Sequence, residues 1–172
     1  MSTFLHFLRG GAACIACVAL LAACSPKFDW REVRGTSAPF TVLLPSKPAT
    51  HTRTVNLDGL QVPMTMTAAD VDGVTFAVGT ADLPDAAQAP KALAAMKTAL
   101  VRNINGAIRL EKASVPGAVP VTIDIEAAGS GRLLLARFLA KDQRVYQVII
   151  VGNESVVSRD AADTFFTSFK LN

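Results

Sequence analysis

The sequence predicts an α+β domain in which an antiparallel β-sheet is flanked by two main helices. Runs of alternating apolar and polar residues are joined by tight-turn dipeptides, as antiparallel hairpins require. One stretch in the middle of the chain and one at its end instead repeat their apolar residues at helical spacing. The elements come in the order strands, helix, four strands, helix, and this grouping is typical of the α+β class.

The first half of the chain is expected to form strands at 30–33 and 40–44, followed by a meander with turns at Asp58-Gly59 and Asp72-Gly73. Both dipeptides tolerate the positive φ of a two-residue turn. Pairing across the first turn divides the hairpin side chains into two faces. The mostly apolar face carries Leu57, Val55, Arg53, His51, Leu60, Val62, Met64 and Met66. The other face, expected to meet water, carries Asn56, Thr54, Thr52, Gln61, Pro63 and Thr65.

A helix is expected over 91–104, because the larger apolar residues there recur at helical spacing. Pro90 suits the first helical position, and Gly106 lies just past the end. The apolar stripe consists of Leu93, Met96, Leu100 and Ile104.

Four more strands and a second helix complete the domain. The strands are expected at 107–115, 120–129, 132–141 and 144–152. With Ser130-Gly131 as a turn, Asp124 falls opposite Arg137, a pair that a sheet favours. The strand over 132–141 is apolar on both faces, so it should be central and covered on both sides. The last helix is expected to start near Ser158, a good N-cap, and its buried stripe consists of Ala162, Phe165, Phe166 and Phe169.

The N-terminus has the layout of a secretory signal peptide, in which one cation, Arg9, precedes a run of apolar or small residues over 10–23. The run is shorter than the roughly 20 residues needed to cross a bilayer. It ends in Leu21-Ala22-Ala23-Cys24, which matches the lipobox of bacterial lipoproteins. This resemblance implies a signal peptide at 1–23, lipidation of Cys24 with acyl chains such as palmitate, and a mature chain that begins at Cys24.

The lipoprotein resemblance also implies a location, namely the bacterial cell envelope, with the domain anchored in a membrane and facing the periplasm. Ser25 after the cysteine favours the outer membrane over the inner one. Residues 24–29 form a short tether, since six residues reach at most about 20 Å when fully extended. A single domain is then expected over 30–172. Trp30 at its start either rests at the membrane interface or packs at the end of the first strand, and packing is the favoured arrangement.

Charge argues against two classes of partner. Without Arg9, 16 of the 17 Lys and Arg remain against 14 Asp and Glu, a net charge of +2. The basic residues are scattered singly along the chain, so neither nucleic acid nor a polybasic lipid surface is a predicted partner. Cys14 and Cys17 lie within the signal peptide, so no internal disulfide is expected in the mature domain.

Three segments of the mature chain resemble the PsbP-like fold family, which includes uncharacterised bacterial members. They are "PFTVLLPSKP" near the start, the strand "VYQVIIVG" and the closing "FFTSFKL". The resemblance extends over most of the mature chain and implies an α/β/α sandwich. It implies no activity, because a fold does not determine a function.

Catalytic, metal and cofactor motifs are not recognised in the mature chain. His51 is its only histidine, and G-x-S-x-G, S-x-x-K and H-E-x-x-H are absent. Asp124 and Glu126 share a strand face as paired carboxylates do, but Arg137 opposite Asp124 favours a structural role. No catalytic residue, metal site or cofactor is therefore predicted.

His51 and Arg53 are the one unusual pair, since they lie on the otherwise apolar face of their hairpin. One interpretation is a polar patch that contacts a ligand or partner at the mouth of a groove beneath the first helix. The other is that both side chains lie at the rim of the core and extend into water. The second interpretation is favoured.

Three functional hypotheses follow, in this order. The first is a non-catalytic lipoprotein that binds another envelope protein. The second is a carrier that holds a small or lipidic ligand between the helix over 91–104 and the sheet, motivated by Ala92, Ala95 and Ala99 facing small residues such as Gly79 and Ala81. The third is an enzyme of unknown type, which the motifs do not favour.

Overall fold

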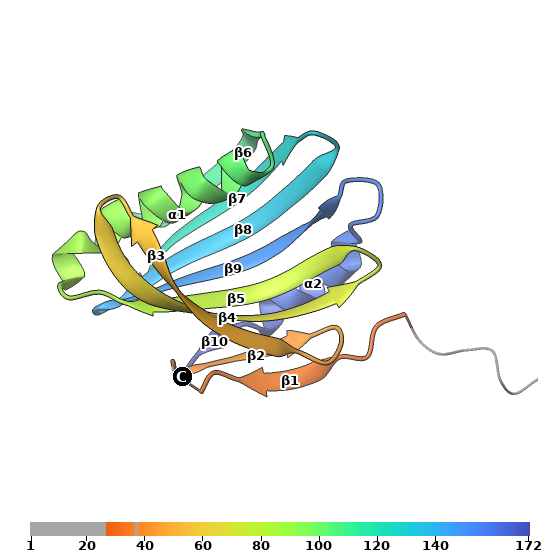
Figure 1. Cartoon of the computed structure of the whole chain (residues 1–172), viewed down its shortest axis with the longest axis horizontal. Helices are drawn as coiled ribbons and strands as arrows, with labels where there is room; N and C mark the ends of the chain where they lie inside the picture. The colour runs from red at the N-terminus through yellow and green to blue at the C-terminus, as the bar shows by residue number, and fades with distance from the viewer. Residues whose placement is uncertain (1–26, 37) are drawn as a thin grey trace, which may run out of the picture.

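The computed structural model describes residues 27–36 and 38–172 (Figure 1). The predicted signal peptide at 1–23, the lipobox and Cys24 lie outside the described residues. Among the helices that are described, none is both long and apolar enough to span a membrane. The described chain forms two sheets and two α-helices, so the predicted α+β class is confirmed.

The centre of the domain is a seven-stranded sheet in the order β3-β4-β5-β9-β8-β7-β6, with every neighbouring pair antiparallel. Its strands are β3 (Ala49–Leu57), β4 (Leu60–Val71), β5 (Val74–Asp82), β6 (Ala107–Ala113), β7 (Val121–Gly129), β8 (Arg132–Lys141) and β9 (Arg144–Asn153). The strands expected at 107–115, 120–129, 132–141 and 144–152 agree with these bounds to within two residues, because tight turns separate most of them.

Two helices cover opposite faces of this sheet (Figure 1). Helix α1 (Ala89–Asn103) follows a short 3₁₀ helix, η1 (Ala86–Gln88), and begins two residues before the predicted start because η1 continues directly into it. It carries the chain from β5 across the sheet to β6 at the far edge. Helix α2 (Arg159–Ser168) begins after Ser158, as expected, and the Ser158 hydroxyl accepts a hydrogen bond from the backbone N–H of Ala161 at 3.3 Å.

The first two strands do not extend the seven-stranded sheet. Strands β1 (Arg31–Arg34) and β2 (Phe40–Leu44) form a separate three-stranded sheet with β10 (Lys170–Leu171) at the C-terminus, in the order β1-β2-β10. The sequence predicted β1 and β2 but neither their separate sheet nor β10. A two-residue strand is too short to show a periodic pattern, and its pairing depends on where α2 delivers the chain.

The turns between strands adopt the backbone that their residues favour. Asp58 and Gly59 have φ values of 55° and 93°, and the dipeptides at Asp72 and Ser130 also combine positive φ at both positions. Because a positive φ is unfavourable for most residue types, dipeptides that tolerate it determine where the chain reverses. The resulting register confirms the predicted pairing of Asp124 with Arg137.

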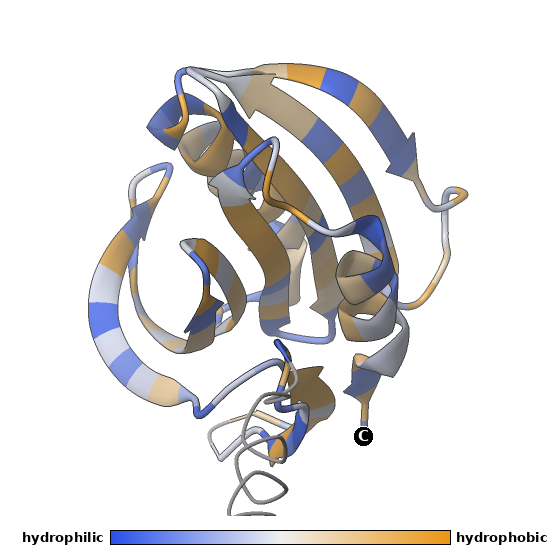
Figure 2. Cartoon of the chain, turned by 90° about the vertical axis from the view of Figure 1, so that its right-hand side faces the viewer, coloured by the Kyte–Doolittle hydropathy of each residue, from blue (hydrophilic) through white to orange (hydrophobic). Residues whose placement is uncertain are grey.

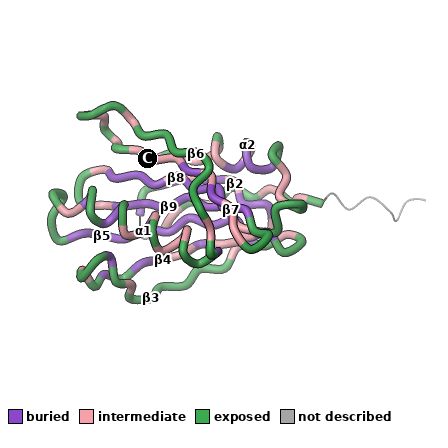
Figure 3. The backbone as a smooth tube through the Cα atoms, turned by 90° about the horizontal axis from the view of Figure 1, so that it is seen from above, coloured by how far each residue is buried: buried purple, intermediate pink, exposed green. Residues whose placement is uncertain are grey.

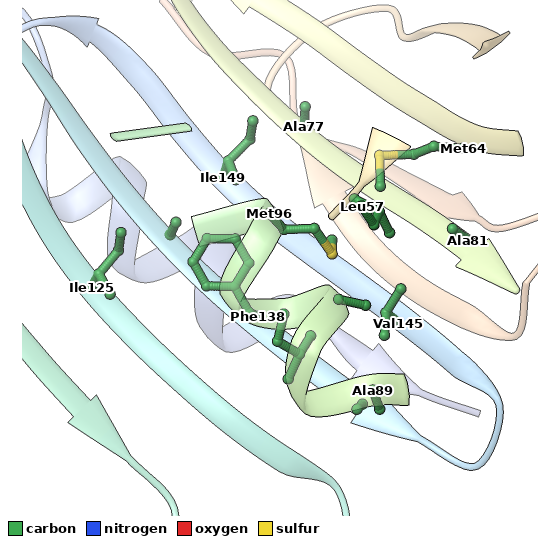
Figure 4. Packing of buried hydrophobic residues seen from close by; sticks show 14 of the residues in the cluster. Leu57, Met64, Ala77, Ala81, Ala89, Met96, Ile125, Phe138, Val145 and Ile149 are labelled. Carbon is green, nitrogen blue, oxygen red and sulfur yellow. The ribbon is translucent and has the colours of Figure 1, made fainter. Parts of the chain in front are cut away.

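Both faces of the central strands are buried, as the composition of 132–141 predicted. In β8, Phe138 points toward α1 and Leu133 toward α2, and each belongs to a separate apolar cluster. Figure 4 shows the cluster beneath α1, where Met96 of the helix meets Phe138, Val145 and other residues of the sheet. The buried stretches concentrate in these strands, and apolar residues dominate them (Figures 2 and 3). The domain is therefore stabilised by two apolar layers, one on each side of a single sheet.

Candidate functional site

The acidic pair considered for acid and base chemistry is held by arginines on the α2 side of the sheet. Asp124 accepts two hydrogen bonds from the Arg137 guanidinium, at 2.7 and 3.0 Å. Glu126 accepts two from Arg159 of α2, at 2.8 and 3.0 Å. The Arg159 guanidinium lowers the pKa of Glu126 below its usual value through these hydrogen bonds. A general acid at neutral pH needs a raised pKa instead, so the arrangement favours a structural role for this pair.

A second arginine pair ties the chain after β9 to the edge of the sheet. Arg109 of β6 bonds Glu154 through both nitrogens of its fork. The hydrogen bonds lower the pKa of Glu154 and raise the pKa of Arg109. Both side chains are exposed, so the pair lies at the surface beside the start of α2.

The other acidic residues considered from the sequence serve turns and caps. Asp82 pairs with Arg144 of the neighbouring strand β9. Asp85 accepts a hydrogen bond from the backbone N–H of Ala87 at the start of η1. Asp72 lies in the β4–β5 turn and pairs with Lys27 at 3.1 Å. Within 27–36 and 38–172, no group of three or more His, Cys, Asp or Glu residues could hold a metal ion.

Trp30 packs against the domain, which is the arrangement favoured from the sequence. Its ring lies edge-on to Phe76 of β5 at 6.3 Å and beside Phe28 at 5.5 Å. Phe28 and Trp30 both pack against the apolar cluster beneath α2. Phe28 therefore already belongs to the packed domain, four residues after Cys24 in the sequence, and four residues reach at most about 14 Å.

Side chains fill the space between α1 and the sheet at Gly79, where the carrier hypothesis places a ligand. Gly79 of β5 faces α1, and a methyl group added there would lie 2.4 Å from the sulfur of Met66 and 2.7 Å from Cγ of Gln147. Gln147 is only 6% exposed, and its amide donates to the Met66 sulfur at 3.3 Å. Ala92 of α1 is fully packed as well. The small residues therefore permit close contact between side chains and leave no space above Gly79.

Two hollows instead lie at the ends of α1. The one beside the β3–β4 turn measures about 390 Å³ and is lined by Leu57, Asp58, Gly59, Leu60, Gln88, Lys91 and Ala92. The other, of about 370 Å³, is lined by Lys97, Thr98, Val101, Arg102, Asn105, Gly106 and Ile108. Lys91 and Asp58 form an ion pair across the first hollow at 3.2 Å. Neither hollow includes His51 or Arg53.

His51 and Arg53 lie in β3, opposite Met66 and Met64 of β4. Both side chains are exposed, at the margin of the α1 face. This position fits the interpretation that they extend into water at the rim of the core, and it also leaves them open to a partner. Strand β3 itself is the first strand of the seven, and within 27–36 and 38–172 no other strand pairs with its outer side.

The free edge of β3 is long and regular. Its nine residues pair with β4 without a register shift, and the residues from Ala49 to Thr54 are exposed (Figure 3). Threonines line the face of β3 opposite to His51 and Arg53. There Thr50 and Thr52 share hydroxyl hydrogen bonds with Thr67 and Thr65 of β4, at 3.0 and 2.8 Å. The sequence predicted this hairpin but could not show that β3 would be an edge strand, because sheet order depends on the later strands.

The opposite edge, β6, is protected in several ways. The register shifts between Ile108 and Leu110, which places a bulge at Arg109. Arg109 pairs with Glu154, and Glu111 pairs with Lys97 of α1 at 2.8 Å. Bulges and charges are the devices by which sheet edges avoid pairing with other chains. Strand β3 has no bulge, and Arg53 is its only residue of fixed charge.

Comparison with known proteins supports the fold. No protein-family model and no curated protein match the chain. Among solved structures, the domain is similar to the solution structure of cyanobacterial PsbP (CyanoP) from Synechocystis sp. PCC 6803, with a TM-score of 0.55 and 13% sequence identity. The match covers 88% of this chain and 99% of that chain. The likeness bears on the fold alone, and the described domain has a PsbP-like fold.

Proposed function

We propose that the protein is a lipid-anchored module of the bacterial cell envelope that acts without catalysis and binds another envelope protein. The observation that carries the proposal is the exposed, regular edge of β3, which presents backbone groups, threonines and the two basic side chains of His51 and Arg53. The non-catalytic part of the proposal is supported by Asp124 and Glu126, because arginines hold both carboxylates in ion pairs.

The anchor determines where such binding takes place. The lipobox motif Leu21-Ala22-Ala23-Cys24 supports lipidation of Cys24 and removal of 1–23. Lys27 pairs with Asp72, so the β4–β5 turn lies next to the first described residues of the chain. The anchored domain then holds this end close to the membrane surface, and Ser25 favours the outer membrane. Strand β3 begins at the same end, where Ala49 pairs with Ala68, and runs away from the membrane toward Leu57.

Met66 and Gln147 fill the space above Gly79, which argues against a carrier that holds a ligand there. An enzymatic function has no described side-chain arrangement in its favour.

The experiment is crosslinking in intact cells followed by affinity capture from detergent-solubilised membranes. A photo-crosslinking amino acid is placed at Thr52 on β3 and, as a matched control, at Lys112 on the protected edge β6. We expect one envelope protein to be captured repeatedly from the Thr52 position. Labelling with an alkyne fatty acid should mark the wild type and be lost in Cys24→Ser. Repeated recovery of the protein alone from every position would contradict partner binding, and a label that persists in Cys24→Ser would contradict the anchor.

A further inference from the structure

The free edge of β3 has a geometry that selects one class of partner. We propose that it binds an extended segment of another protein as an added antiparallel strand, and that this segment carries carboxylates at two alternate positions, opposite His51 and Arg53. The inference rests on the proposed partner-binding function and names the surface and the chemistry by which it would operate.

The backbone of β3 is arranged to accept such a strand. Leu57 and Leu60 flank the two-residue turn, so they form a hydrogen-bonded pair, and bonded and non-bonded pairs alternate along the hairpin from there. The backbone N–H and C=O groups of Thr50, Thr52 and Thr54 therefore point away from β4, toward solvent. An added strand satisfies these groups by the hydrogen bonds that sheets use to bind extended peptides.

The edge lacks what would exclude another strand. No proline or bulge interrupts its nine paired residues, whereas β6 at the other edge has a bulge at Arg109 and two ion-paired charges. Long, regular and uncovered edges pair readily with other chains. The two edges of this sheet thus differ, and only β3 among them is open along its length.

The side chains of the edge specify the charge of the segment. His51 and Arg53 are two residues apart, so they point to the same face, and neither forms an ion pair with another described residue. Residues directly opposite in an antiparallel pair are close enough for opposite charges to attract. A segment with Glu or Asp at two alternate positions would therefore face the Arg53 guanidinium and the His51 imidazole, whose ring N–H can donate a hydrogen bond to a carboxylate. Its other residues would face Thr52 and Thr54.

A second copy of this chain is a poorer occupant of the same edge. Symmetric antiparallel pairing of two β3 strands centred near residue 52 places Arg53 opposite His51 or Arg53 of the other copy. Two arginines directly opposite each other destabilise a sheet, and His51 supplies no negative charge to attract Arg53. Charge complementarity thus favours an acidic partner segment over self-association.

The test uses the full lipidated chain in detergent micelles and a synthetic peptide, TVTETET, capped at both ends. Binding is measured by chemical-shift changes of backbone amides. We expect the shifts to map to β3, and the peptide TVTQTQT to bind more weakly. Arg53→Glu should weaken binding of TVTETET by about five- to tenfold, since attraction becomes repulsion. Thr52→Pro should weaken it by at least about tenfold, because proline removes an outward N–H of the edge.

The matched control is Lys112→Glu, which reverses an exposed charge on β6. It should leave the affinity for TVTETET unchanged, and melting curves should show that all three variants fold. The inference is overturned if TVTETET causes no shifts in β3, if Arg53→Glu binds as the wild type does, or if Lys112→Glu weakens binding equally.

The cellular crosslinking separates this inference from the proposed function. If an envelope partner is still captured with Thr52→Pro from other positions of the domain, partner binding holds and the β3 inference fails. If no position captures a partner, the proposed function fails. Crosslinks between the β3 strands of two copies of this chain would show that a second copy, and not an acidic segment, occupies the edge. That result would overturn the inference.

Discussion

At the scale of single residues, charged side chains bind elements together on the α2 side of the sheet. The pairing of Asp124 with Arg137 was predictable, because both residues lie in strands joined by the tight Ser130-Gly131 turn, and that turn sets the register of the hairpin. The pairing of Glu126 with Arg159 was not, since Arg159 lies in α2 and the contact depends on how that helix docks. The sequence therefore favoured a structural role for Asp124 from Arg137 opposite it, but it offered no such partner for Glu126.

Glu126→Gln tests the contribution of this ion pair to stability. Arg159 lowers the pKa of Glu126 in the folded state below the usual 4.5, so the contribution is fully present above about pH 4.5 and is lost as the pH falls through the folded pKa. At pH 7 the variant should lose up to about 1 kcal/mol of unfolding free energy, because Arg159 is largely exposed.

Urea unfolding of wild type and variant between pH 3 and 7 measures this difference. Glu32→Gln is the control, since Glu32 pairs with Arg34 on an exposed strand, and it should change stability little at any pH. An unchanged difference between pH 3 and 7 would show that the Glu126 charge does not contribute.

At the scale of elements, local signals in the sequence define most of the boundaries. Turn dipeptides with positive φ end and start the strands, and the stripe from Leu93 to Ile104 marks α1. The start of α2 follows from Ser158, whose hydroxyl caps the helix, and from Asp160 in its first turn, where the helix dipole favours an anion. Strand β10 and helix η1 were missed, because two or three residues are too few to show a period.

Ser158→Ala tests the cap of α2. The substitution leaves the backbone N–H of Ala161 without its side-chain acceptor, so the free energy of unfolding should fall by about 0.5–2 kcal/mol. Thermal or urea unfolding at pH 7 measures the loss. Thr164→Ala serves as the control, since the Thr164 hydroxyl bonds the carbonyl of Asp160 inside the helix and does not cap it. Equal stability of Ser158→Ala and wild type would show that the cap contributes nothing.

At the scale of the whole molecule, the two ends of the described chain meet in the small sheet. Strand β2 pairs with β1 on one side and with β10 on the other. The backbone N–H of Asn172 donates to the carbonyl of Pro39 at 3.1 Å, and its side chain donates to Thr41 at 3.0 Å. Phe40 of β2 also stacks on Phe169 at 5.9 Å. The C-terminus therefore closes the layer that covers the α2 side of the core.

Deletion of residues 170–172 tests this closure. The variant loses the pairing of Leu171 with Phe40 and the bonds of Asn172, which should cost about 1–3 kcal/mol at roughly 1 kcal/mol for each hydrogen bond. Hydrogen exchange should speed up at β2 and remain slow at β8 in the centre of the sheet. Deletion of Asn172 alone is the control and should have a smaller effect. Unchanged protection of β2 would show that β10 is dispensable.

The sequence by itself determined the features that depend on neighbouring residues: the turns, the hairpin registers, the two helices, the burial of both faces of β8 and the lipobox at Cys24. Tertiary structure alone decided which strands form the edges, that β1 and β2 leave the main sheet, and that Met66 and Gln147 fill the space above Gly79. The reason is that local backbone preferences act within a few residues, whereas sheet order and packing are set by contacts between segments far apart in the chain. His51 and Arg53 illustrate both: the hairpin pattern placed them on one face, and only the sheet order placed them on an open edge.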